Sequence, residues 1–184
     1  WQENQLDQLR KWVDQGHVLA GHGWVHQVQK RKSFYHKLHG VFISRYVAEH
    51  LSLTREGILG LMQKNYEWFG RHDLPSPTHY VPPAWALGKV RLDDLKGCPF
   101  QSVETLRGVL IPSEGRFCPV PLLGYEADTP FRARFLKIFN AINRKKASSQ
   151  ELIRIALHPL DLSHQLSKDL MEDCKSSVCQ SHFR

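Results

Sequence analysis

Long apolar runs, paired cysteine motifs and internal repeats are the features that this sequence of 184 residues lacks. No apolar stretch approaches the ~20 residues needed to span a bilayer, so we predict no transmembrane helix. The four cysteines show no C-x-x-C spacing and are too sparse for a small disulfide scaffold, which predicts reduced thiols. Free thiols and the lack of a visible signal peptide predict a cytoplasmic protein.

The rest of the composition is typical of a globular chain. Hydrophobic residues make up 41% and charged residues 23%, and the length suits one domain over residues 1–184. Lys and Arg outnumber Asp and Glu by 25 to 18, and the resulting net charge of +7 would favour anionic partners. Because the basic residues are scattered, we interpret them as solvated surface, and nucleic-acid binding is a minor alternative.

Hydrophobic periodicity predicts an α/β fold. Apolar residues recur at helical spacing in four segments: 4–15, 54–70, a segment beginning near 130, and 163–172. Short apolar or β-branched runs predict strands at 18–20, 78–81, 100–103, 109–111, 116–120 and 152–157. Residues 26–52 lack a clean period and predict a long loop. Helices that alternate with buried strands indicate a largely parallel sheet, either open or closed into a barrel.

Histidines follow two of the predicted strands. His22 and His26 are spaced i and i+4, which lets two imidazoles reach one Zn²⁺-like ion, although a pair of ordinary surface or core imidazoles is the alternative. The segment from Tyr80 to Trp85 and the residue His158 also follow strands, so a parallel sheet would gather them at one edge. A metal, an aromatic wall and an imidazole with a pKa of ~6.5 are the parts of a metal-assisted hydrolase.

Three motifs resemble those of a known family. They are HGWVHQ at residues 22–27, YVPPAWALG at 80–88 and IALHPLDL at 155–162. In order and spacing they resemble the polysaccharide deacetylase superfamily, especially a little-characterised branch with H-G-x-x-H, F-V-P-P-A-W and L-x-H-P signatures. The resemblance covers nearly the whole chain and implies a distorted or incomplete (β/α) barrel. It also implies a hydrolase that removes acetyl groups from N-acetylated sugars or polysaccharide, using one divalent metal, expected to be Zn²⁺, held by an aspartate and two histidines.

The same resemblance implies roles for individual side chains. His22 and His26 would be the two metal ligands. The carbohydrate groove would be lined by Pro82, Pro83, Trp85 and Leu157. His158 would protonate the departing amine. The alternative for Trp85 is a packed core position, and the alternative for His158 is a strand-end histidine that is bonded to backbone.

Two departures from the superfamily pattern are visible. The first strand of the superfamily usually carries two aspartates, of which one acts as a base and the other is the third metal ligand. No such strand precedes residue 17, so we expect it upstream of Trp1. Val81 stands where many members of the superfamily have an arginine. The branch that this chain resembles shares an apolar residue at this position. Asp161 is expected to cap the final helix, with assistance to His158 as the other reading. A non-catalytic glycan-binding or assembly protein on the same scaffold is the alternative to an enzyme.

Overall fold

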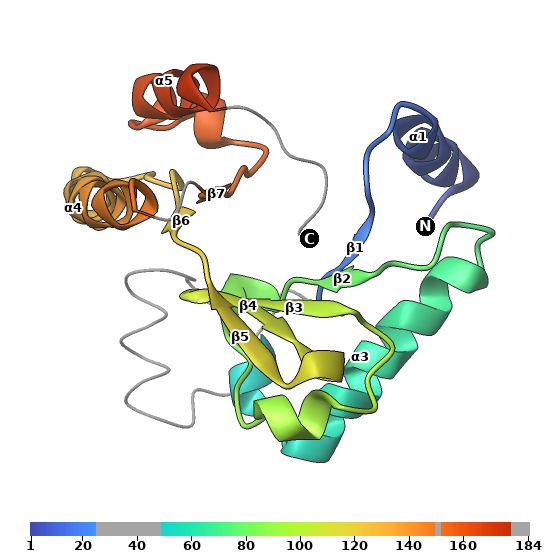
Figure 1. The fold of residues 1–184 in the computed structure, drawn as a ribbon. Helices are drawn as coiled ribbons and strands as arrows, with labels where there is room; N and C mark the ends of the chain where they lie inside the picture. The colour runs from blue at the N-terminus through green and yellow to red at the C-terminus, as the bar shows by residue number, and fades with distance from the viewer. Residues whose placement is uncertain (25–48, 150–151, 178–184) are drawn as a thin grey trace. The chain divides into compact units, whose positions relative to one another are not determined.

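The computed structural model describes residues 1–24, 49–149 and 152–177 (Figure 1). They belong to two compact units, Trp1–Pro119 and Val120–Arg184. The described residues of the first unit form two α-helices, a five-stranded sheet and several short 3-10 turns. Its helices and strands are α1 (Glu3–Asp14), β1 (Ala20–Gly21), α3 (Arg55–Gly70), β2 (His79–Tyr80), β3 (Ser102–Thr105), β4 (Gly108–Ile111) and β5 (Arg116–Pro119), and its 3-10 turns are η2 (Glu49–Ser52), η3 (Pro83–Trp85), η4 (Leu92–Leu95) and η5 (Pro112–Glu114).

The sheet of the first unit is mixed, and its strands follow the order of the chain. β1, β2 and β3 are parallel neighbours, as the alternation of helices and strands predicted. β3, β4 and β5 instead form an antiparallel meander. The antiparallel part arises because only short turns separate these strands, and a parallel connection would need a dozen or more residues.

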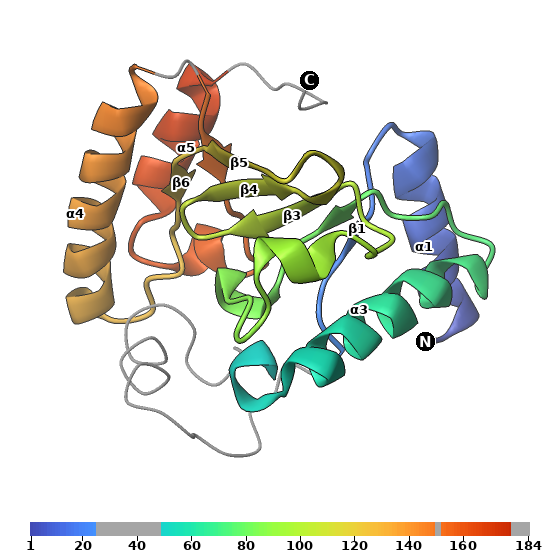
Figure 2. The same ribbon diagram turned by 60° about the horizontal axis from the view of Figure 1, so that its bottom comes forward.

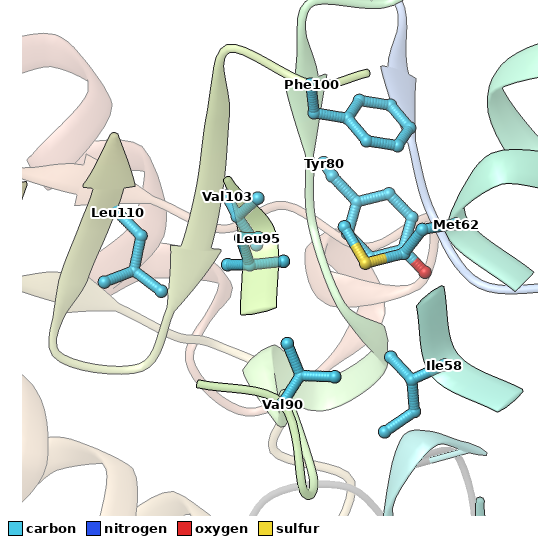
Figure 3. Close-up of a cluster of buried hydrophobic side chains, with 8 residues drawn as sticks. All are labelled: Ile58, Met62, Tyr80, Val90, Leu95, Phe100, Val103 and Leu110. Carbon is cyan, nitrogen blue, oxygen red and sulfur yellow. The ribbon is translucent and has the colours of Figure 1, made fainter. Parts of the chain in front are cut away.

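Helix α3 supplies much of the core beneath this sheet (Figure 2). It begins after Thr54, whose side chain accepts a hydrogen bond from the Gly57 amide at 3.1 Å. Ile58 and Met62 lie one turn apart on its buried face and pack against Tyr80 from β2 (Figure 3). The other buried members of this cluster are Val90, Leu95, Phe100, Val103 and Leu110. The predicted helix from 54 to 70 is therefore confirmed, together with its apolar stripe.

Helix α1 packs near the far end of α3. Its buried Leu6 forms a small cluster with Phe69 of α3 and Leu74. Gly16 follows with φ of +89°, a left-handed conformation that favours glycine and ends the helix. The predicted helix over 4–15 is confirmed to within one residue at each end.

The second unit is built around a two-stranded parallel sheet. Its elements are β6 (Leu122–Leu123), α4 (Pro130–Ala147), β7 (Arg154–Ile155), the 3-10 turn η6 (Asp161–Ser163) and α5 (Ser167–Ser176). The Asn140 side chain bonds both backbone groups of Gly124, at 3.0 and 2.9 Å, and so ties α4 to the segment after β6. Leu136 of α4 and Leu170 of α5 close the core against Leu123 of β6.

Both units mix helices and strands, whereas barrel closure stays a prediction. Within the described ranges, no helix is long and apolar enough to cross a membrane.

Candidate functional site

The first two motifs meet where β1 and β2 end. Gly21 pairs with Tyr80 in the parallel ladder, and the Val81 amide donates to the Gly21 carbonyl at 2.8 Å. The segments that follow these strands therefore leave the sheet at the same edge. This arrangement is the one that the parallel-strand argument predicted for His22 and for the Tyr80 to Trp85 segment.

His22 is an exposed residue directly after β1, and its Nδ1 lies 2.6 Å from the Val81 carbonyl oxygen. Because a carbonyl oxygen can only accept, Nδ1 carries the proton in this bond, and Nε2 is the nitrogen with a lone pair. Metal-binding histidines are commonly oriented by such a bond from the other ring nitrogen. The second predicted ligand, His26, lies outside the described residues. Within those residues, no group of three or more His, Cys, Asp or Glu side chains is arranged to hold a metal.

The predicted groove wall forms a strained turn after β2. Pro82 and Pro83 are buried, and Pro83 opens the 3-10 turn η3. Ala84 and Trp85 follow with φ of +55° and +54°, a left-handed conformation that costs roughly 1–3 kcal/mol for each non-glycine residue. The half-buried Trp85 donates its indole N–H to Glu104 at 3.2 Å. Its side chain is therefore neither fully exposed in a groove nor fully buried in the core.

Three side chains form hydrogen bonds with the backbone of Gly23 and Trp24, directly after His22. The Gly23 amide donates to Tyr80 Oη at 3.3 Å, and the Gly23 carbonyl accepts from Asn65 Nδ2 at 3.0 Å. The Trp24 amide donates to Glu49 Oε2 at 2.8 Å. Tyr80, Asn65 and Glu49 are all buried, and together we call them the turn clamp.

His50 contacts one member of the turn clamp, Tyr80. Its ring is fully buried, and Nε2 lies 2.8 Å from Tyr80 Oη. Burial, assisted by the nearby His22, lowers the pKa of His50 from 6.5 to about 4, so the ring is neutral at neutral pH. Burial also raises the pKa of Tyr80, which keeps its hydroxyl protonated. The neutral ring therefore shares one hydrogen bond between Nε2 and the Tyr80 hydroxyl, and Tyr80 Oη also accepts the Gly23 N–H.

An exposed aromatic side chain stands beside His22 in the sequence. Trp24 is 40% exposed, and the Lys64 ammonium lies 3.9 Å from the centroid of its ring. Such a cation–π contact is typically worth ~0.5–1 kcal/mol at an exposed site. The ammonium therefore lies over one face of a ring that is partly exposed to solvent.

The third motif belongs to the second unit, where it follows β7. The His158 side chain is 40% exposed, and its Nδ1 lies 3.5 Å from Asp161 Oδ2. The same carboxylate oxygen accepts the His158 backbone N–H at 2.9 Å, and Asp161 begins the turn η6 rather than the last helix. Leu157 is 64% exposed. A role of His158 and Leu157 in the chemistry of His22 stays a prediction.

Sequence reasoning missed Glu49, His50 and Asn65. One signal was available for Asn65, because it falls on the buried stripe of α3 between Met62 and Phe69, where a polar residue is out of place. Glu49 and His50 came from a stretch without periodicity and gave no such signal. Comparison with models of known protein families, with curated proteins and with solved structures finds no match to this chain.

Proposed function

We propose that this chain is a metal-dependent hydrolase that removes acetyl groups from N-acetylated sugars. The observation that supports the proposal most strongly is the 2.6 Å bond between His22 Nδ1 and the Val81 carbonyl, made where two parallel strands end. It selects the tautomer whose Nε2 can bind a metal, and it joins two of the three motifs that resemble the deacetylase superfamily.

The donor set of the first motif suits a zinc-like ion. His22 would bind through Nε2, at the ~2.0–2.1 Å typical of zinc and imidazole, and His26 would be the second ligand. A divalent metal, when bound, polarises the acetyl carbonyl and lowers the pKa of water. The chain itself holds His22 in one tautomer, through Val81.

Other residues of the chain would bind the sugar and move a proton. The exposed ring of Trp24 would pack against the pyranose, and the turn that carries Pro83 and Trp85 would border it. His158 would donate a proton to the departing amine, a role that imidazole side chains often take as general acids. The carboxylate of Asp161 beside its Nδ1 would leave Nε2 as the donating nitrogen.

Metal analysis with single variants tests the proposal. After incubation with Zn²⁺ and dialysis, we expect about one zinc per wild-type chain and a loss of most of it in His22→Ala. His17→Ala is the matched control, because His17 is an exposed histidine five residues earlier in the sequence. Full zinc content in His22→Ala would remove the assignment of this ligand. Acetate release from chitin oligosaccharides, lost in His22→Ala and in His158→Ala, would support the reaction.

A non-catalytic glycan-binding protein is the second candidate, and the exposed ring of Trp24 favours it. Such a protein would bind chitin oligosaccharides equally well after treatment with a chelator and would release no acetate. A hydrolase of the proposed kind would lose acetate release under the same treatment. The two functions are therefore separated by one titration and one product assay.

A further inference from the structure

Three side chains fix the backbone that follows His22. Its two amides and one carbonyl, in Gly23 and Trp24, bond to side chains from three separate elements of the first unit. Tyr80 comes from β2, Asn65 from α3, and Glu49 from η2. Gly23 is buried, so its backbone groups do not bond to bulk water, and the side chains that satisfy them also fix the position of the turn.

The turn is also enclosed on its remaining sides. Gly23 has φ of +45°, and a Cβ at this position would lie 2.5 Å from Pro83 Cγ and 3.0 Å from Glu49 Oε2. Glycine is therefore required both by the left-handed backbone and by the lack of space. With its hydrogen bonds fixed and its sides occupied, the turn has little freedom to rotate or shift.

The turn clamp and the adjacent His50 are costly for stability. Glu49, His50 and Asn65 are buried polar side chains, and among the described residues His50 Nδ1 and Asn65 Oδ1 have no hydrogen-bond partner. Each unpartnered buried polar atom typically costs ~1–3 kcal/mol. Apolar side chains of similar volume would avoid this cost, so stability alone does not account for these residues.

We infer that Tyr80, Asn65 and Glu49 are positioning residues for His22, on which they act through the backbone of Gly23 and Trp24. The inference rests on the proposed function, because it assigns a purpose to the orientation of His22. Glu49 and Asn65 fix the turn from the η2 and α3 sides. Tyr80 fixes it from the end of β2, directly before Val81, whose carbonyl accepts from His22 Nδ1.

Tyr80→Phe is the sharpest test, because it removes one oxygen and keeps the ring in the core. We expect the Zn²⁺ affinity of the full chain to fall about tenfold or more, as is typical when a partner outside the metal ligands is removed. We also expect nitrogen-15 NMR of the His22 ring to show a mixture of tautomers in place of the single Nδ1–H form. Tyr66→Phe is the matched control, because Tyr66 packs against the same core cluster with its ring edge-on to Phe100.

The outcomes separate this inference from the proposed function. A Tyr80→Phe protein that keeps wild-type Zn²⁺ affinity and the pure Nδ1–H tautomer of His22 overturns the positioning role. If the wild-type chain binds no Zn²⁺ through His22, the proposed function fails, and the tautomer measurement alone then decides whether the turn clamp orients His22. Should Tyr80→Phe unfold, Asn65→Leu provides the second variant, with the same two readouts and the same expected changes.

Discussion

Burial of His50 should make folding stability depend on pH below neutrality. In the folded chain its pKa is lowered from 6.5 to about 4, first by burial and then by the charge of His22. Unfolding exposes the ring and restores its ordinary pKa. Above pH 6.5 the ring is neutral in both states, and its contribution is complete. Below pH 6.5 the unfolded chain binds a proton that the folded chain does not, so stability falls as the pH falls, until the folded chain binds it near pH 4.

The size of this effect follows from the two pKa values of His50. At about 1.36 kcal/mol per pKa unit, the difference between 6.5 and about 4 corresponds to a loss of about 3 kcal/mol. That is a large fraction of the roughly 5–15 kcal/mol by which native domains are stable. Urea unfolding followed by tryptophan fluorescence, at half-unit intervals between pH 4 and 7.5, measures the loss directly.

His50→Gln is the variant that isolates this contribution. Its amide can still contact Tyr80, but it does not titrate, so the other groups of the chain change stability equally in both proteins. The difference in unfolding free energy between wild type and variant should shrink by about 3 kcal/mol from pH 7.5 to pH 4. A difference that stays constant over this range would refute the reasoning and would mean that His50 titrates as it does in the unfolded chain.

Three further substitutions test contacts within the two units. Gly23→Ala forces a Cβ to within 2.5 Å of Pro83 Cγ on a left-handed backbone, and we expect a loss of about 1–3 kcal/mol in urea unfolding. Gly60→Ala, in a helical position with nothing within 4 Å, should instead raise stability by about 0.5–1 kcal/mol, and equal effects of the two changes would contradict this account. In the second unit, Asp173→Asn removes the charge that faces the Arg144 guanidinium at 2.5–2.8 Å, and we expect a loss of about 1–3 kcal/mol. Unchanged unfolding of Asp173→Asn would show that this ion pair contributes nothing.

The parts of the fold that sequence predicted well have a long period or a clear boundary. Helix α3 was found because its apolar spacing extends over four turns and Thr54 caps it. The strands over 152–157 and 116–120 were predicted too long, since β-branched content shows where a strand can form but not where its partner ends. The short strand Leu122–Leu123 was missed because two residues cannot display a period.

One part of the candidate site could be predicted from the sequence, and another part could not. The meeting of His22 with the segment after Tyr80 followed from a general property of parallel strands, which needs only the two strand positions. The turn clamp did not follow, because its partners are 25, 42 and 57 residues apart in the sequence. Contacts of this kind depend on how helices lie over a sheet, and periodicity in one segment carries no information about them.

Most of the buried side-chain atoms without hydrogen-bond partners, among the described residues, lie in or near the motif segments. Among the described residues of the first unit, the buried atoms without hydrogen-bond partners belong to His50 and Asn65, beside the turn after His22. Among those of the second unit, such atoms belong to Asp161 in the third motif, to His164 just after it, and to Arg132 in α4. Folding alone selects against unpartnered buried polar atoms, and exceptions are expected where function constrains the side chains. Their concentration beside the segments that the sequence singled out supports a functional reading of both segments.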